Sequence, residues 1–286
     1  MSHPSRAARS WLLAALAAWT LAADAGCHAV LVTRETSLGK LPPGTDLESL
    51  TASPDGRHVA CEAERDGKRR VAIDGVEGKP FDKILEGTLR FSPDGRRYLY
   101  AGRRGDKRVV VVDGKEGKPY DRIGTGEPVF SPDGKHVAYR AIIGKEWFVV
   151  VDGLEGKRYD GIADHTLLFS PDGRRVACAA RRGQQWLVVV DGVEGKEYAR
   201  VGTRSLVFSP DSRRFAYVAT CGGKWLVVVD GVEQTAYDEI SDGPPVFSPD
   251  SRHVAYIAWS GGPPLSRPTK DITPTRQVWA ARSEDE

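Results

Sequence analysis

The sequence is poor in the residues that most often carry chemistry. Its 286 residues include four cysteines, six histidines and one methionine. No P-loop, Gly-x-Ser-x-Gly or His-Glu-x-x-His pattern occurs, and the stretch Gly114–Pro119 lacks the length and the Ser or Thr of a P-loop. We therefore expect no catalytic residues, no metal site and no cofactor, and we expect the protein not to be an enzyme.

Neither sign of charge is in excess. Lysine and arginine total 41 residues, and aspartate and glutamate total 39, which gives a formal net charge of +2. A chain that binds nucleic acid through the phosphates usually shows a clear basic excess. We therefore expect no nucleic-acid partner.

No apolar run is long enough for a comfortable membrane-spanning helix. The longest, Trp11–Ala23, follows Arg6 and Arg9 and is shorter than the roughly 20 residues that a span needs. With the Ala-Asp-Ala at residues 23–25, it indicates a signal peptide over residues 1–26. The Ala-Gly before Cys27 resembles the end of a bacterial lipobox, so Cys27 is a candidate lipidation site. A lipoprotein is the favoured interpretation, and plain secretion and an uncleaved anchor are the alternatives; all three place the rest of the chain outside the cytoplasm.

What the sequence does contain is a repeat. Ser-Pro-Asp, followed by Gly or Ser, occurs six times at a constant spacing of 39 residues. The pair Asp-Gly keeps the same period. A fixed period near 40 residues is typical of repeat architectures. The six copies begin at Ser53, Ser92, Ser131, Ser170, Ser209 and Ser248.

The third repeat predicts four short strands joined by tight turns. Its runs are rich in β-branched and aromatic residues, and the turns hold Pro, Asp and Gly, which favour turn conformations. No repeat has an apolar stripe of helical period. The strands are expected at 128–130, 136–141, 147–151 and 158–162. The third strand is apolar on both faces, which indicates that each sheet lies between two other layers.

Three phrases carry a resemblance to a known family. Phe91–Gly95, Phe130–Gly134 and Phe169–Gly173 each precede a basic residue and a strand similar to Val-Ala-Tyr. They resemble the WD40-like propeller repeat of TolB-like proteins over residues 48–282. The resemblance implies a β-propeller and a role in binding envelope proteins. TolB also carries an N-terminal domain, which we expect to be absent because only residues 28–47 precede the first repeat.

Two segments fall outside the regular repeat. Residues 260–276 include six Gly and Pro residues, a composition that favours disorder over function. In the sixth repeat no fourth strand follows residues 277–281, and we expect Ala29–Thr33 to supply it, because open sheet edges invite aggregation. The expected division is a signal peptide at 1–26 and one propeller at 28–286 that carries the 260–276 loop.

The cysteines beyond Cys27 are interpreted as buried thiols. Cys61 and Cys178 occupy one repeat position, which holds tyrosine in the other four repeats. Repeats one and four face each other across a six-blade ring, too far apart for a disulfide. Cys221 lies near the end of a strand in the fifth repeat, and no disulfide is expected there either.

Histidines and paired carboxylates are interpreted as structural. His58, His136 and His253 share a repeat position that holds arginine in the other repeats, which indicates a solvated strand start rather than a zinc site. A cation could bridge Asp152 and Glu155 and their equivalents, but the turn already accounts for these residues. A metal is therefore not the favoured interpretation.

One repeat position is a candidate for binding a partner. Trp147, Trp186 and Trp225 begin the third strand in three successive repeats, and Arg69 and Arg108 stand there in the first two. Trp and Arg often anchor protein interfaces. A wedge between neighbouring blades is the favoured interpretation, and a partner-binding face is the functional one.

These patterns lead to one fold prediction and two functional ones. The fold is all-β, a six-bladed β-propeller of four-stranded antiparallel blades with a 39-residue repeat. The favoured function is a monomeric, non-catalytic scaffold that binds proteins of the cell envelope, in the periplasm or at the outer membrane or cell surface, with a lipid at Cys27 as its only membrane contact. The alternative is small-ligand binding or a hydrolytic enzyme that uses the central channel. Its channel-mouth candidates are Glu127, Asp164, His165 and Arg204.

Overall fold

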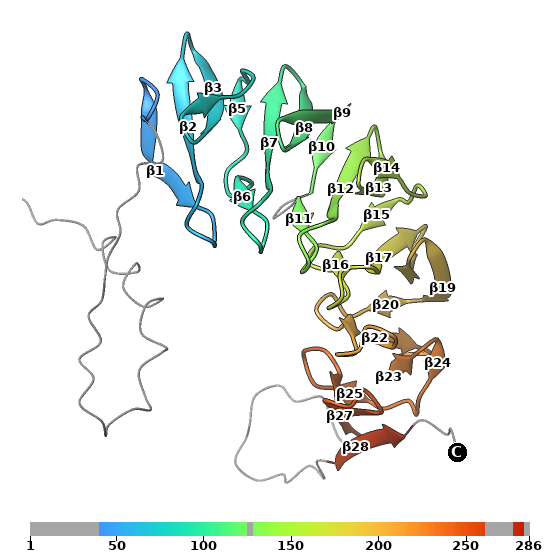
Figure 1. The fold of residues 1–286 in the computed structure, drawn as a ribbon. Coiled ribbons are helices and arrows are strands. Elements are labelled where there is room, and N and C mark those ends of the chain that lie inside the picture. The colour runs from blue at the N-terminus through green and yellow to red at the C-terminus, as the bar shows by residue number, and fades with distance from the viewer. Residues whose placement is uncertain (1–39, 125–127, 261–276, 283–286) are drawn as a thin grey trace, which may run out of the picture. The chain divides into compact units, whose positions relative to one another are not determined.

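The part of the chain described by a computed structural model is all-β. It comprises residues 40–124, 128–260 and, as backbone, the strand at 277–282. In this part the strands form six antiparallel sheets, one for each Ser-Pro-Asp repeat, which follow one another along the chain (Figure 1). No helix among these residues is long and apolar enough to cross a membrane. The predicted signal peptide, Cys27, the strand expected at Ala29–Thr33 and nearly all of the 260–276 loop lie outside the described residues.

We number the sheets 1 to 6 in chain order. Sheet 1 contains β1 (Thr45–Ala52), β2 (Val59–Arg65), β3 (Lys68–Ile73) and β4 (Val76–Glu77). Sheet 2 contains β5 (Lys83–Ile84), β6 (Arg90–Phe91), β7 (Tyr98–Arg104), β8 (Lys107–Val112) and β9 (Lys115–Tyr120). Sheet 3 contains β10 (Arg122–Ile123), β11 (Val129–Phe130), β12 (Val137–Ile143), β13 (Glu146–Val151) and β14 (Leu154–Glu155). Sheet 4 contains β15 (Gly161–Ile162), β16 (Leu168–Phe169), β17 (Val176–Arg182), β18 (Gln185–Val190) and β19 (Val193–Tyr198). Sheet 5 contains β20 (Arg200–Val201), β21 (Val207–Phe208), β22 (Phe215–Cys221), β23 (Lys224–Val229) and β24 (Val232–Glu233). Sheet 6 contains β25 (Glu239–Ile240), β26 (Val246–Phe247), β27 (His253–Trp259) and β28 (Gln277–Arg282).

Sheets 1 to 5 have the antiparallel four-position order of a β-propeller blade, and the described strands of sheet 6 occupy its first three positions. In sheet 3 the two long strands β12 and β13 pair from Ala138↔Val151 to Ile143↔Glu146. The first position is interrupted, because β10 and β11 pair with opposite ends of β12. The fourth position, β14, pairs with the other side of β13. The repeated sequence therefore folds as a series of blades, as predicted.

The fourth strand differs from its prediction at residues 158–162. In sheet 3 it begins at Leu154, directly after the Asp-Gly turn, and reaches Tyr159 only through an isolated bridge to Trp147. Gly161–Ile162 belongs to the next sheet as β15. The reason is the two-residue turn, which places Val151 opposite Leu154 and so starts the pairing at once.

The Ser-Pro-Asp turn is built around a buried serine hydroxyl. Ser131 is fully buried; its hydroxyl donates to Asp133 Oδ1 at 2.6 Å and accepts the His136 N–H at 2.9 Å. The fourth position has a positive φ, 72° at Gly134 and 66° at Ser212, which explains why Gly is preferred there. Where Ser replaces Gly, its hydroxyl binds the preceding sheet: Ser212 Oγ accepts the Asp172 N–H at 3.0 Å.

The Asp-Gly turn connects the third and fourth strands. Asp152 and Gly153 both have positive φ, 50° and 81°, as the type I′ turn of a two-residue hairpin requires. The Asp152 carboxylate accepts the Val137 N–H at 2.9 Å and contacts His136 Nδ1 at 2.6 Å. The same aspartate therefore shapes the turn and ties it to the start of the second strand.

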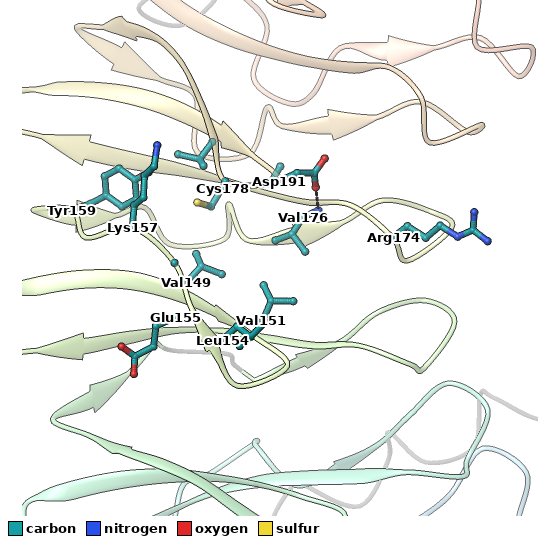
Figure 2. Close-up of a pocket in the computed structure, with 14 residues that line it drawn as sticks. Val149, Val151, Leu154, Glu155, Lys157, Tyr159, Arg174, Val176, Cys178 and Asp191 are labelled. Atoms are coloured by element: carbon teal, nitrogen blue, oxygen red, sulfur yellow. Dashed lines mark hydrogen bonds between the residues drawn. The ribbon is translucent and has the colours of Figure 1, made fainter.

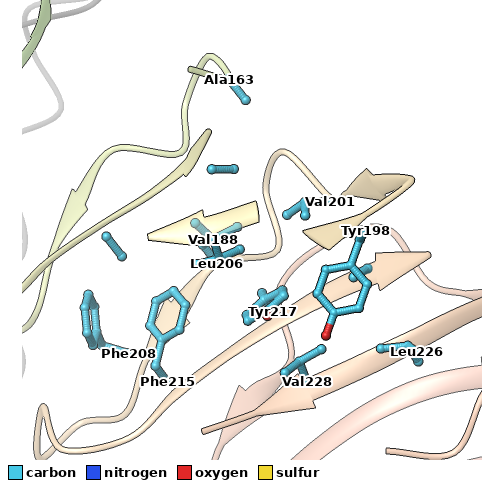
Figure 3. Close-up of a cluster of buried hydrophobic side chains, with 13 residues drawn as sticks. Ala163, Val188, Tyr198, Val201, Leu206, Phe208, Phe215, Tyr217, Leu226 and Val228 are labelled. Atoms are coloured by element: carbon cyan, nitrogen blue, oxygen red, sulfur yellow. The ribbon is translucent and has the colours of Figure 1, made fainter. Parts of the chain in front are cut away.

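The core lies between successive sheets rather than inside one. Figure 3 shows one such cluster, in which Val188 of sheet 4 packs with Phe215 and Tyr217 of sheet 5. Burial of these aliphatic and aromatic faces supplies the main driving force for stacking the sheets. Side chains at the sheet faces therefore decide how tightly each pair of neighbours is held.

Gly102 lies where the faces of two neighbouring sheets are in close contact. Its position holds alanine in sheets 3 to 6, but a Cβ on Gly102 would lie 2.4 Å from the ring of Phe81 in the turn before β5. Because Phe81 is fully buried, we expect Gly102→Ala to lower the free energy of unfolding by about 1–3 kcal/mol. Urea denaturation measures this loss. The double variant Gly102→Ala/Phe81→Leu should recover part of it, and an unchanged urea midpoint for Gly102→Ala alone would contradict the packing.

Candidate functional site

The three tryptophans line successive seams between sheets. Trp147, Trp186 and Trp225 are half-buried, and each packs against the hydrophobic cluster that its own sheet shares with the next one. Trp147 and Tyr159 also exchange backbone hydrogen bonds at 2.9 and 2.8 Å. This placement supports the wedge interpretation. A partner-binding role for the same edge stays a prediction.

The two arginines at the equivalent position are also half-buried. Arg69 contacts Glu64 at 3.0 Å and Asp46 at 3.6 Å, both in sheet 1. Arg108 donates to the Ile123 carbonyl in sheet 3 at 3.5 Å. Like the tryptophans, Arg108 therefore joins its sheet to the next.

At the position shared by histidine and arginine, the arginines clamp neighbouring sheets together, which corrects their interpretation as a solvated strand start. Arg97 Nε contacts Asp113 Oδ2 at 2.8 Å in its own sheet. Its Nη1 donates to the carbonyls of Gly134 and Lys135 in the Ser-Pro-Asp turn of the next sheet. Its guanidinium lies 5.5 Å from the centroid of the Phe130 ring. Arg175 and Arg214 repeat these contacts toward sheets 5 and 6.

The predicted channel-mouth residues lie on exposed turns, apart from Glu127, which is outside the described residues. Asp164 and His165 are neighbours in one turn, and Arg204 occupies the equivalent turn of sheet 5. The Asp164 carboxylate forms an ion pair with Arg140, in which Oδ1 and Nη1 lie 2.8 Å apart. Catalysis or ligand binding by these residues stays a prediction.

Arg140 is a buried arginine that sequence reasoning missed. Its side chain is 1% exposed and also donates to the Ile162 carbonyl at 3.1 Å, so it links sheet 3 to the first strand position of sheet 4. Ala101, Ala179 and Val218 occupy its position in other repeats. A charge at a position that is otherwise mostly apolar was the available signal.

An exposed aliphatic strip follows the fourth strands. Val76, Leu154, Val193 and Val232, which we call the aliphatic strip, are 74%, 77%, 72% and 64% exposed. They share one repeat position, directly after Asp-Gly, and Lys115 stands there in sheet 2. The glutamates after Leu154, Val193 and Val232 tie neighbouring sheets together, as in the pairs Lys118–Glu155 at 3.2 Å and Lys196–Glu233 at 2.8 Å. Apolar side chains therefore recur in the open at one position of the repeat.

A pocket of about 320 Å³ opens between sheets 3 and 4 (Figure 2). Its walls are apolar and include Val149 and Val151 from sheet 3 and Val176, Cys178 and Val189 from sheet 4. Its volume is at the lower end of the range typical of small-molecule sites. The sequence predicted that Cys178 is buried, but it did not predict the pocket beside this residue.

The pocket arises because sheet 4 presents small side chains to sheet 3. Three residues on the second strand of each sheet face the preceding sheet: Val176, Cys178 and Ala180 in sheet 4, against Phe215, Tyr217 and Ala219 in sheet 5. Valine also stands at the position of Val176 in sheets 3 and 6, so among sheets 2 to 6 the change particular to sheet 4 is the thiol of Cys178 in place of a tyrosine ring. Cys178 lies 3% exposed at the pocket wall, and no disulfide involves it.

In the Asp-Gly-x-Glu turn of sheet 3, the two carboxylates contact residues of different sheets. Asp152 binds His136 and the Val137 N–H in its own sheet, whereas Glu155 contacts Lys118 and Tyr120 of the preceding sheet. Among residues 40–124 and 128–260, no group of three or more His, Cys, Asp or Glu is placed to hold a metal ion.

Comparisons with known proteins agree with the resemblance noted in the sequence. No family model and no curated protein matches the chain. Similar solved structures include TolB from Acinetobacter baumannii, at 19% identity over 65% of this chain and 52% of that one, with a TM-score of 0.35. The β-propeller domain of the trilobed protease from Pyrococcus furiosus aligns at 13% identity over 85% of this chain and 82% of that one, with a TM-score of 0.34. A eukaryotic initiation factor aligns at 14% identity over 80% of this chain and 61% of that one, with a TM-score of 0.47. This chain thus spans about half of TolB, and the similarity concerns the fold alone.

Proposed function

We propose that this chain is a non-catalytic, protein-binding scaffold of the cell envelope. The observation that carries the proposal is the aliphatic strip, in which four aliphatic side chains are at least 64% exposed at one repeat position. A partner with apolar side chains of matching spacing would cover the strip and remove this surface from water.

The charged residues around the strip favour binding over chemistry. Lys157–Glu194 at 3.5 Å and Lys196–Glu233 at 2.8 Å bridge neighbouring sheets along the strip. Arg104, in turn, holds Glu116 at 2.9 Å. The two lysine–glutamate pairs link neighbouring sheets beside the strip, which favours a preorganised surface for a partner. The signal-peptide pattern at residues 1–26 supports an envelope location.

Site-specific photocrosslinking tests where a partner binds. A benzophenone amino acid is placed at Val193 on the strip, at Trp186 on the tryptophan edge and at Arg204 in the channel-mouth turn, in the mature protein mixed with an envelope fraction. We expect one crosslinked protein, obtained mainly from position 193. Adding Leu154→Lys, which copies the natural Lys115, should reduce that product several-fold because a charge interrupts the strip.

Two outcomes would contradict the proposal. Crosslinks obtained only from position 204 would place binding at the channel mouth, and the absence of any crosslinked protein from all three positions would argue against a scaffold. The melting temperature of Leu154→Lys serves as the control, because residue 154 is 77% exposed and its replacement should not unfold the sheet.

A further inference from the structure

The pocket between sheets 3 and 4 interrupts a regular series of aromatic pairs. At the other interfaces, an aromatic ring from the end of one sheet meets a tyrosine from the second strand of the next sheet. The ring centroids lie 6.0–6.2 Å apart, and the rings meet edge to face. The pairs are Phe81–Tyr100, Tyr120–Tyr139, Tyr198–Tyr217 and Tyr237–Tyr256. Between sheets 3 and 4, Tyr159 meets Cys178 instead.

At three of these four interfaces, the hydroxyl of the second tyrosine lies beside a glycine of the preceding sheet. A Cβ added to Gly78 would lie 3.2 Å from Tyr100 Oη, and one added to Gly117 would lie 3.6 Å from Tyr139 Oη. The tyrosine ring thus spans the interface and ends beside a glycine on the fourth strand of the preceding sheet. At the equivalent Gly156, only the Val149 carbonyl lies within 4 Å of an added Cβ among the described neighbours. Gly156 lines the pocket, so the vacant volume lies where a tyrosine ring would be.

The pocket also opens to solvent. The valines equivalent to Val149 are Val71, Val110, Val188 and Val227, and all four are at most 2% exposed. Val149 alone among these five is only partly buried. The missing ring therefore leaves a route by which a small molecule reaches the pocket.

We propose that this pocket binds a small phenol, a single aromatic ring that carries one hydroxyl group and takes the place of the absent tyrosine side chain. The ring lies between Val149, Val176 and Val189 and meets Tyr159 edge to face, as the tyrosines do elsewhere. Its hydroxyl donates to Tyr159 Oη, which is able to accept this bond because its own proton goes to Glu194 Oε1 at 2.9 Å. Pockets with mostly apolar walls and a few polar groups are typical binding sites for small molecules. The inference does not depend on the scaffold function.

Titration with p-cresol, the phenol that corresponds to a tyrosine side chain, tests the proposal. We expect saturable binding to the full mature chain by calorimetry, and at least tenfold weaker binding to Cys178→Tyr, in which the ring is restored covalently. Cys178→Ala should keep the pocket and bind p-cresol about as well as the wild type.

Tyr159→Phe, which removes only the hydroxyl partner, should weaken the binding of p-cresol several-fold and leave the binding of toluene unaffected. In the Cys178→Tyr background, Tyr217→Cys opens the equivalent space between sheets 4 and 5 and should restore binding.

A second measurement needs no variant. Saturating p-cresol should slow the reaction of Cys178 with a maleimide at least fivefold and leave the exposed Cys221 unchanged, which mass spectrometry of the labelled peptides reports separately. The proposal is overturned if p-cresol shows no saturable binding to the wild type, if Cys178→Tyr binds it equally well, or if Cys178 is not protected.

Discussion

Acid should lower the stability of this protein between about pH 4 and about pH 2. The aspartates of the six Ser-Pro-Asp turns each have a pKa held below the ordinary value of about 3.9, chiefly because the turn serine donates its hydroxyl to the carboxylate. For Asp133 the pKa falls to about 2. A depressed folded pKa means that the unfolded chain takes up protons first as the pH falls. The stability from these turns is therefore complete above about pH 4 and is lost as the pH falls through the folded pKa values.

Thermal unfolding across pH 2–7 at constant ionic strength measures this effect. The slope of the melting temperature against pH reports the protons taken up on unfolding, and we expect several near pH 3 because six aspartates contribute. Asp133→Asn should reduce that uptake by about one proton. A melting temperature that stays constant from pH 5 to pH 2 would show that the turn carboxylates are not bound as described.

Replacing Arg214 with alanine should lower the free energy of unfolding by about 2–4 kcal/mol. The guanidinium donates to Asp230 at 2.8 Å and to the Arg252 carbonyl of sheet 6 at 2.8 Å, and hydrogen bonds to charged groups contribute about 1.5–3 kcal/mol each. The side chain is 23% exposed, which reduces the contribution of its ion pair, so the estimate stays below the sum. Urea denaturation, analysed as a shift of the midpoint at constant slope, measures the loss.

The residues found at the position of Arg214 in other sheets provide matched control substitutions. Arg214→His copies the residue found in sheets 1, 3 and 6; it should keep a bond to the Asp-Gly aspartate, lose the bonds to the next sheet, and cost about half as much as alanine. The reverse change, His136→Arg, should raise the urea midpoint by adding a clamp from sheet 3 to sheet 4. If Arg214→His is as stable as the wild type, the cross-sheet bonds contribute nothing measurable.

Local features of the repeat were predictable from sequence, whereas contacts between repeats were not. Asp133, Gly134 and the Asp152-Gly153 turn follow from conformational preferences within a few residues, and the structure confirms each. The two-residue pieces β10 and β11 are too short for a period to reveal, so the interruption of the first strand was missed. Arg97 was misread because its partner Gly134 lies 37 residues away.

For the candidate sites, too, features within one repeat were easier to predict than those that depend on several repeats. Repeat alignment placed Cys178 at a tyrosine position, but the resulting space becomes visible only when the strand face toward sheet 3 is known. Trp147 was correctly assigned to a seam because aromatic residues at strand starts fill the gap between sheets. The aliphatic strip was overlooked because a single valine or leucine in a turn gives no signal by itself; the signal lies in its recurrence every 39 residues.

The contacts between sheets 3 and 4 are uneven, and this has a mechanical consequence. At the first-strand edge, buried Arg140 ties the two sheets through Ile162 and Asp164, whereas toward the fourth strands the faces are separated by the pocket. We therefore expect sheets 3 and 4 to separate more easily at the pocket than at Arg140. Opening this joint sacrifices less packing than opening the seam between sheets 4 and 5, where Phe215 and Tyr217 fill the interface. In a molecule assembled from near-identical units, one replaced ring thus makes one joint softer than the others.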